Sequence, residues 1–290
     1  SSDVCSSDLS PGIYTGTVTF SAQGVPSAVL PLRLRVLPFR LREPENQILG
    51  EYYRGPQLAR TEPQEREFLT RDLEDMRKHG MTSIGLCMGC PTQQATIADG
   101  KVELNLSGAS LYEHCLDTYR DLGFPAPIVQ LSDSGQSFAA QCKVAFGSPE
   151  YALAYTAFWR AFQQLARQRG WPEVIVQPVD EPGWKDQEAK DRNVTLLKLG
   201  KSVAGLRTEQ DGPGDGYFHD RAGPFSDVWN YNGGIASDAI VQGARKAGRL
   251  VMLYNCDVES YRPEVGRYVA GFFQERANID GYYNWAYMSW

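Results

Sequence analysis

The chain has 290 residues, of which 42% are hydrophobic and 22% are charged, and its formal net charge is -6 at pH 7. This length suits one barrel-sized domain with a small appendage, and the composition excludes an intrinsically disordered chain. Because the charge is acidic and no run of basic residues or of ~18 apolar residues occurs, we expect neither a nucleic-acid partner nor a membrane-spanning helix.

The chain opens with SSDVCSSDL, which resembles translated sequencing-adapter read-through, so residues 1–9 are set aside as a non-native tail. Apolar and polar residues then alternate from Tyr14 to Phe20 and again from Leu30 to Val36, as in two half-buried strands. A lone hairpin is at best marginally stable in water. We therefore interpret residues 10–44 as the last hairpin of an N-terminal β-sandwich domain followed by a linker.

From residue 45 onward, short apolar runs alternate with helical patterns, the order that produces a parallel sheet. The expected strands span 48–53, 83–88, 127–131, 174–179, 206–210, 227–231, 250–254 and 281–285. Eight strands favour a (β/α)8 TIM-type barrel over an open doubly wound sheet, although loss of the weak fifth strand would leave seven. Both ends of the chain look cut, so we expect residues 45–290 to be a barrel truncated at its C-terminus.

The helices between these strands show start signals and apolar stripes. Thr61 and Gln64 predict a capping box, and Ser148 followed by Pro149 predicts a second helix start. The segment 211–223 is rich in Gly and Asp and is predicted to be a loop. The expected buried stripes are Leu69, Leu73 and Met76; Leu153, Ala157, Phe158, Ala161 and Leu165; Ile240, Val241 and Ala244; and Val265, Val269 and Phe272.

Functional groups of such a barrel lie where strands end and the following loops begin. There the sequence is acidic and aromatic, a lining that suits a neutral sugar because rings cover its C–H faces while carboxylates and amides bond its hydroxyls. The predicted substrate-binding residues are Glu51, Tyr53, Asp133, Trp229, Asn230, Tyr231, Tyr254, Asn255, Asn284 and Trp285, with Tyr52 and Asp257 at the same level.

No phosphate-binding loop and no convincing metal spacing occurs, so we expect no cofactor and no metal. Cys87 and Cys90 form a C-x-x-C motif without a second pair, and plain thiols are the preferred interpretation.

The sharpest local pattern is VIVQPVDEPGW, in which a buried strand leads into the adjacent carboxylates Asp180 and Glu181. Neighbouring carboxylates repel, so one tends to keep its proton while the other ionises, and glycosidic cleavage requires such a pair. Pro182 is expected to keep Glu181 extended. The alternative is a solvated turn without chemistry.

Successive side chains on a regular strand point to opposite faces, so both acids reach one cavity only if the chain has already left the strand. Their spacing also fits poorly with a nucleophile and an acid on opposite sides of the sugar. A different division of labour follows if the substrate carries a 2-acetamido group, whose own carbonyl oxygen can attack the anomeric carbon. The carboxylate beside the general acid then only orients that amide.

The hairpin PGIYTGTVTF, the linker, VDEP after strand four and the closing GYYNWAYMSW together resemble glycoside hydrolase family 123 over residues 11–290. The resemblance implies a retaining β-N-acetylgalactosaminidase in which Asp180 orients the acetamido group and Glu181 is the general acid/base. It also implies a carbohydrate partner carrying a terminal amino sugar, and we expect a secreted or periplasmic bacterial protein.

Two alternatives stay open. DEP is similar to the Asn-Glu-Pro of a large glycosidase clan that places a nucleophile after strand seven, where this chain has Asp257 and Glu259. The same barrel mouth could also bind a glycan without cleaving it. The oligomeric state and the sugar linkage do not follow from the sequence.

Overall fold

A computed structural model describes residues 9–39, 43–44, 46–88, 95–98, 101–104, 110–131, 135–232, 237–256 and 263–287. Contacts divide the chain into two units, Ser1–Glu45 and Asn46–Trp290. In the first unit, β1 (Gly12–Ala22) and β2 (Val25–Val36) pair antiparallel, with Tyr14 opposite Leu34 and Val18 opposite Leu30. The predicted hairpin is thus present, with its apolar face exposed; its membership of a β-sandwich stays a prediction.

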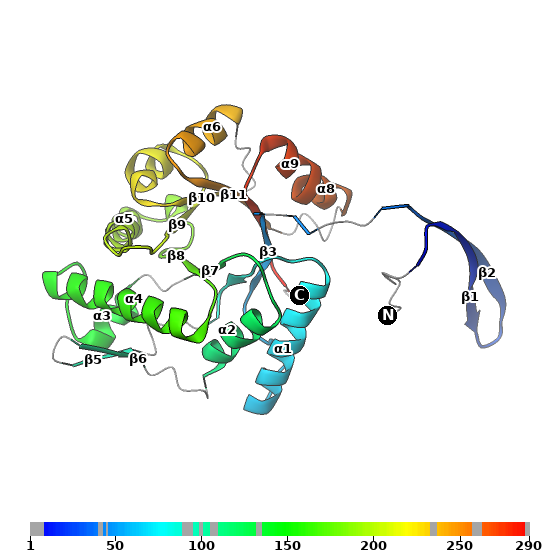
Figure 1. Cartoon of the computed structure of the whole chain (residues 1–290), viewed down its shortest axis with the longest axis horizontal. Helices are drawn as coiled ribbons and strands as arrows, with labels where there is room; N and C mark the ends of the chain where they lie inside the picture. Colours follow the sequence, from blue (N-terminus) through cyan, green and yellow to red (C-terminus); the bar gives the residue numbers. More distant parts are fainter. Residues whose placement is uncertain are drawn as a thin grey trace. The chain divides into compact units, whose positions relative to one another are not determined.

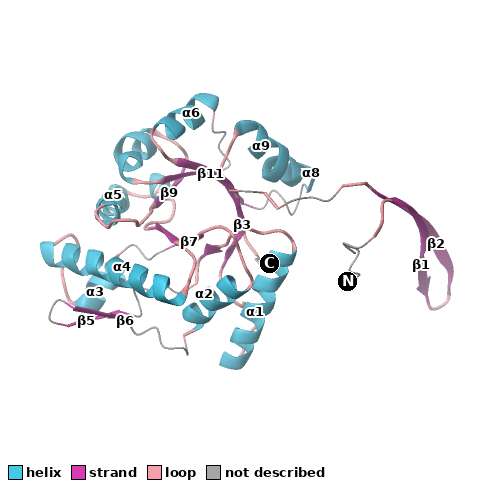
Figure 2. Ribbon diagram, viewed as in Figure 1, coloured by secondary structure: helices cyan, strands magenta, loops and turns pink. Residues whose placement is uncertain are grey.

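The second unit is a (β/α)8 barrel, as predicted, with the strands gathered at its centre and the helices outside them (Figure 1, Figure 2). Every neighbouring pair in its eight-stranded sheet is parallel, in the order β8-β7-β4-β3-β12-β11-β10-β9. The strands are β3 (Ile48–Tyr53), β4 (Gly85–Leu86), β7 (Ile128–Leu131), β8 (Val174–Gln177), β9 (Glu209–Gly212), β10 (Val228–Asn232), β11 (Leu250–Cys256) and β12 (Gly281–Trp285).

The helices of this unit stand between its strands along the chain, although, among the described residues, no α-helix separates β9 from β10. They are α1 (Glu62–Lys78), α2 (Leu111–Asp121), α3 (Gln136–Cys142), α4 (Pro149–Arg169), α5 (Gln187–Lys201), α6 (Asp238–Lys246), α8 (Pro263–Arg267) and α9 (Gln274–Ala277). An antiparallel pair, β5 (Ala95–Ala98) and β6 (Lys101–Leu104), stands between β4 and α2.

The two predicted helix starts differ in outcome. Ser148 Oγ accepts the backbone N–H of Tyr151 at 3.1 Å, and Pro149 opens α4, as predicted. The capping box of α1 was wrong, because the Thr61 side chain accepts no such bond and Gln64 Oε1 instead accepts the N–H of Arg60 at 3.0 Å. The buried stripe of α1 is the predicted one.

The stripe predicted for α4 was partly wrong. Phe158 is fully buried, but Leu153 is 71% exposed. The face that packs inward instead carries the larger aromatic rings, which bury more apolar surface than the alanines of the predicted stripe. Its fully or nearly fully buried rings are Tyr151, Tyr155, Phe158, Trp159 and Phe162.

Two π-helical turns account for other differences. Phe272, predicted to be buried, is 77% exposed, and Phe273 packs against the core instead. Both lie in η5 (Tyr268–Phe273), where a wider turn shifts the buried stripe by one position. The predicted loop 211–223 likewise contains a π-helical turn, η3 (Tyr217–Ala222), before the 3₁₀ turn η4 (Gly223–Phe225).

Side chains fill the interior of the barrel. Tyr52, Tyr254 and Tyr283 form one buried cluster there with aliphatic residues of β3, β7, β8, β10 and β11. Room for the Tyr283 ring depends on Gly50, where a Cβ would lie 2.8 Å from Tyr283 Cε1. The barrel is a packed core, and open space is expected only at its ends.

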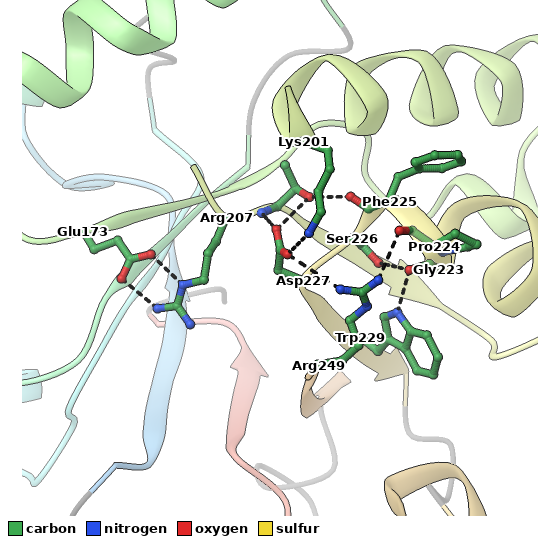
Figure 3. Close-up of polar contacts among 11 residues, drawn as sticks. Glu173, Lys201, Arg207, Gly223, Pro224, Phe225, Ser226, Asp227, Trp229 and Arg249 are labelled. Carbon is green, nitrogen blue, oxygen red and sulfur yellow. Dashed lines mark hydrogen bonds and ion pairs between the residues drawn. The ribbon is translucent and has the colours of Figure 1, made fainter. Parts of the chain in front are cut away.

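The barrel closes between β8 and β9 through few lateral bonds. In the middle, Val176 forms an isolated parallel bridge with Thr208, and its N–H donates to the carbonyl of Arg207 at 3.0 Å. At the amino ends of these strands, the Arg207 guanidinium holds both carboxylate oxygens of Glu173, at 2.5 and 2.7 Å (Figure 3). Two-point pairing of this kind is geometrically specific, which suits a bond that sets the register of two strands.

The same end of the barrel holds a second polar group, centred on Asp227 just before β10 (Figure 3). Its carboxylate accepts Lys201 Nζ at 2.6 Å and the backbone N–H of Thr208 at 3.0 Å. Polar networks at the amino ends of barrel strands serve stability, because function lies at the carboxyl ends.

Candidate functional site

The adjacent acids Asp180 and Glu181 lie beyond the end of β8, which stops at Gln177. Glu181 has φ 44° and ψ 50°, so it is left-handed rather than extended, and the expectation based on Pro182 was wrong. Two backbone bonds hold this conformation: the Glu181 N–H donates to Asp211 Oδ1 at 2.9 Å, and the Glu181 carbonyl accepts the N–H of Trp184 at 3.2 Å. Because the chain has left the strand, both neighbouring carboxylates can face one cavity.

That cavity lies at the carboxyl ends of the barrel strands and has a volume of about 230 Å³. Strands β3, β7, β9, β11 and β12 and the segments following β4 and β8 contribute to its wall. Larger hollows lie along α1 and between α6 and α9, on the outer helices, where this fold rarely places chemistry. The lining residues of the strand-end cavity are Tyr52, Cys87, Leu131, Asp180, Glu181, Asp211, Tyr254 and Trp285.

The Glu181 carboxylate is held by two donors from neighbouring strands. Tyr254 Oη donates to Glu181 Oε1 at 2.6 Å, and Asn232 Nδ2 donates to the same oxygen at 3.2 Å. Burial first, and then the nearby Asp211 and Glu181, raise the pKa of Tyr254, so its hydroxyl keeps the proton that it donates. The position of this carboxylate is therefore defined before any ligand arrives.

Asp180 is held more loosely. Its side chain is 56% exposed, and its Oδ2 lies 3.7 Å from Lys185 Nζ. An exposed pair at this separation contributes little binding energy, so the carboxylate can leave it at small cost. Asp180 also lines the cavity, where it can meet a polar group of a ligand.

Aromatic rings form one side of the cavity. The Tyr52 ring lies 5.6 Å from that of Trp285 and 6.2 Å from that of Tyr254, between ring centroids. The Arg54 guanidinium stands over Trp285 at 5.8 Å. Tyr254 and Trp285, both predicted from the sequence as substrate-binding residues, thus line the same cavity as the two acids.

Two buried carboxyl groups on β9 were missed by the sequence prediction. Burial, followed by the charges of Asp180 and Glu209, raises the pKa of Asp211 well above its usual range. Burial likewise raises the pKa of Glu209 to about 8, although Asn230 Nδ2 donates to its Oε1 at 3.0 Å. Glu209 is therefore a neutral acid near pH 7, and the shift at Asp211 favours its neutral form in the same way.

Asp211 and Asn232 share a sequence signal that would have identified them. Each stands one residue beyond the predicted end of its strand, at Gln210 and Tyr231 respectively, and both strands continue through it. Polar residues just past a predicted barrel strand thus belong among the candidates for a site.

Three predicted binding residues face outward, away from the cavity. Tyr53 Oη donates to Asp72 on α1 at 2.9 Å, Trp229 Nε1 donates to the Gly223 carbonyl at 3.4 Å, and Tyr231 Oη lies 3.0 Å from His219 Nε2. Strand side chains alternate between the interior and the helix layer, and these three fall on the helix side.

The remaining described predictions also lie outside the cavity wall. Asn230 is fully buried inside the barrel, where it bonds Glu209 and lies 3.4 Å from Tyr52 Oη. Glu51 is half-buried and is among the charges that, after burial, raise the pKa of Tyr287. Asn284 is half-buried and alternates along β12 with Trp285, which lines the cavity.

Several predicted positions lie outside the described residues, namely Asp133, Asp257, Glu259 and Cys90. For Asn255, the structure describes the backbone, which pairs with Asn284.

Within the described residues, no group of three or more His, Cys, Asp and Glu side chains could hold a metal ion. Burial raises the pKa of the Cys87 thiol to about 12, so it is a neutral thiol in the cavity wall. Across the described part of the chain, no helix is both long and apolar enough to cross a membrane.

Neither a protein-family model nor a curated protein matches the sequence. The structure is similar to that of a family 39 glycoside hydrolase from Bacteroides cellulosilyticus WH2, with a TM-score of 0.56 and 13% identity, covering 95% of this chain and 64% of that one. It is also similar to a family 1 β-glucosidase from Thermotoga maritima, with a TM-score of 0.51 and 12% identity, covering 84% of this chain and 88% of that one. At such identities the similarity shows the (β/α)8 fold alone.

Proposed function

We propose that this protein is a glycoside hydrolase with Glu181 as its general acid/base. The observation that carries the proposal is the meeting of Asp180 and Glu181 with Tyr52 and Trp285 in one sugar-sized cavity at the strand ends. Two proteins with similar barrels are a family 39 glycoside hydrolase and a family 1 β-glucosidase, and their activities agree with the proposal.

The adjacent acids favour a substrate that carries a 2-acetamido group on the sugar that is released. In the first step Glu181 donates its proton to the glycosidic oxygen while the acetamido carbonyl oxygen attacks the anomeric carbon, and the bond to the leaving group breaks. Asp180 accepts the amide N–H and stabilises the positive charge that develops on the cyclised amide. In the second step the Glu181 carboxylate takes a proton from water, and the water oxygen attacks the anomeric carbon. The bond from the acetamido oxygen to that carbon breaks, so the amide is restored and the anomeric configuration is retained.

A conventional second carboxylate is less well supported among the described residues. The third carboxyl group of the cavity, Asp211, is 2% exposed, and its Oδ1 already accepts the N–H of Glu181. Burial raises its pKa and so favours the protonated form, which is a poor nucleophile. The acids that the alternative mechanism would use, Asp257 and Glu259, lie outside the described residues, and the described part of β11 places Tyr254 against Glu181. The proposal therefore assigns a β-N-acetylhexosaminidase resembling family 123 rather than a two-carboxylate enzyme.

The test compares nitrophenyl β-glycosides that differ only at carbon 2. We expect hydrolysis of the N-acetyl-β-galactosaminide and little hydrolysis of the plain β-galactoside, because the acetamido oxygen supplies the nucleophile. Equal turnover of the two substrates would refute acetamido participation while leaving a hydrolase intact.

A second comparison separates catalysis from glycan binding. Glu181→Gln should lower kcat by ~10² to 10⁴, the usual cost of removing a general acid, while ligand binding persists. Glu188→Gln is the matched control, because Glu188 lies on the exposed side of α5, where its side chain is 77% exposed. Binding of the glycoside without turnover by the unaltered protein would support a noncatalytic barrel instead.

A further inference from the structure

Asp211 on β9 is the one described carboxyl group of the cavity that has no role in the proposed reaction, and it contacts the general acid directly. Its Oδ1 accepts the backbone N–H of Glu181 at 2.9 Å across 30 residues of sequence. We propose that Asp211 is a positioning residue that fixes the backbone of Glu181 and thereby aims its carboxylate. This inference rests on the proposed function of Glu181.

The first support is the conformation of Glu181 itself. A left-handed conformation disfavours any residue with a Cβ, and the following proline favours an extended backbone instead. Glu181 nevertheless has φ 44° and ψ 50° immediately before Pro182. Such a conformation persists only where neighbouring groups hold it in place, and Asp211 is the side chain that bonds the N–H of this residue.

The second support is the rigidity of Asp211. It lies on β9, opposite Asn230 of β10 in parallel register, and is only 2% exposed. Gly212 follows it with φ 141°, a backbone conformation that side chains rarely adopt. An acceptor on a buried strand therefore fixes a donor in the loop after β8.

The third support is charge. Burial, Asp180 and Glu209 all raise the pKa of Asp211, which favours the neutral form of the group that faces Glu181. A neutral carboxyl group still accepts a hydrogen bond through its carbonyl oxygen, and it spares the cavity a third negative charge. Asparagine has the same shape and the same acceptor, which provides a conservative variant.

The contacts of Glu181 combine these features. Its N–H meets Asp211, its carbonyl meets Trp184, and its carboxylate meets Tyr254 and Asn232. If the N–H loses its partner, the backbone can relax toward the extended conformation that Pro182 favours. The carboxylate would then turn away from Tyr254, and a displacement of 1 Å at a reacting group can cost about 10²-fold in rate.

The experiment compares Asp211→Asn, Asp211→Ala and Asp211→Val in the full chain. We expect Asp211→Asn to keep kcat within a few-fold of the unaltered protein, and Asp211→Ala to lower kcat about 10²-fold with a small change in KM. Asp211→Val also lacks the acceptor but keeps most of the buried volume. It should therefore show the same loss of kcat, and it provides the test if Asp211→Ala folds poorly. Asp186→Ala is the matched control, because Asp186 also accepts a backbone N–H at 2.8 Å, but that of Ala189 at the start of α5 and not that of Glu181.

Amide hydrogen exchange at Glu181 measures the positioning without any substrate. We expect exchange there to quicken about tenfold or more in Asp211→Ala and Asp211→Val but not in Asp211→Asn, the equivalent of a lost hydrogen bond. Unchanged exchange in the alanine and valine variants, or an asparagine variant as impaired in kcat as the alanine one, would overturn the positioning role. If the unaltered protein hydrolyses no glycoside but the exchange pattern holds, the hydrolase proposal fails while Asp211 still fixes Glu181.

Discussion

Glu209 lies inside the barrel with no exposed surface, and its state of protonation can be tested through stability. Its Oε1 accepts Asn230 Nδ2 at 3.0 Å, while Oε2 has no hydrogen-bond partner among the described residues. Burial raises its pKa from 4.5 to about 8. At neutral pH the folded protein therefore keeps a proton that the unfolded chain releases.

The sign of the pH effect follows from this difference. Below the ordinary pKa of a glutamic acid, both states are protonated and the group contributes no pH dependence. As the pH rises toward 8, ionisation favours the unfolded chain, so the free energy of unfolding falls by about 1.4 kcal/mol per pH unit for this proton. Between pH 5 and 7.5 the loss amounts to about 3 kcal/mol, and the raised pKa of Asp211 acts in the same direction.

Urea unfolding at pH 5 and pH 7.5 measures the effect. Glu209→Gln removes the titrating group and keeps an acceptor for Asn230, so the variant should lose about 3 kcal/mol less than the unaltered protein between these two pH values. Glu188→Gln removes an exposed carboxylate and should leave the slope unchanged. Equal pH dependence in Glu209→Gln and the unaltered protein would refute a neutral Glu209.

Two further substitutions test the opposite ends of the barrel. Tyr254→Phe removes the 2.6 Å hydrogen bond to Glu181. It should lower kcat at least about tenfold in steady-state hydrolysis while the melting temperature stays unchanged. An unchanged kcat would contradict the role of this bond. Asp227→Ala removes the acceptor for the Thr208 N–H and the partner of Lys201. It should lower the free energy of unfolding, measured in urea, by about 1–3 kcal/mol while kcat is retained. A loss of activity without a loss of stability would contradict its structural role.

Most of the barrel could be predicted from the sequence because buried parallel strands are continuous apolar runs. Predicted strands 48–53 and 281–285 coincide with β3 and β12. The fifth strand was placed too early, at 206–210, because Leu206 is apolar, whereas the strand itself has the polar sequence Glu209–Gly212. A prediction that identifies buried strands by their apolar residues misses a strand whose buried residues are polar.

The candidate site was predictable in its location but not in its membership. A strand end identifies a level of the barrel, whereas a single-residue step decides between the interior and the helix layer. Trp285 thus lines the cavity, while Trp229 packs against η3 on the outside. The left-handed backbone of Glu181 depends on Asp211, 30 residues away, and no local pattern contains that information.

The sparse closure between β8 and β9 links the cavity to the opening motions of the barrel. The contacts that join β8, β9 and their flanking residues include Glu173 with Arg207, Val176 with Arg207 and Thr208, and Glu181 with Asp211. The contact between Glu181 and Asp211 lies in the cavity wall. A ligand that touches both residues would therefore add a contact at the junction of β8 and β9, which few lateral bonds join. A ligand bound there should therefore slow the opening of the β8–β9 junction more than the opening of a continuous strand pair.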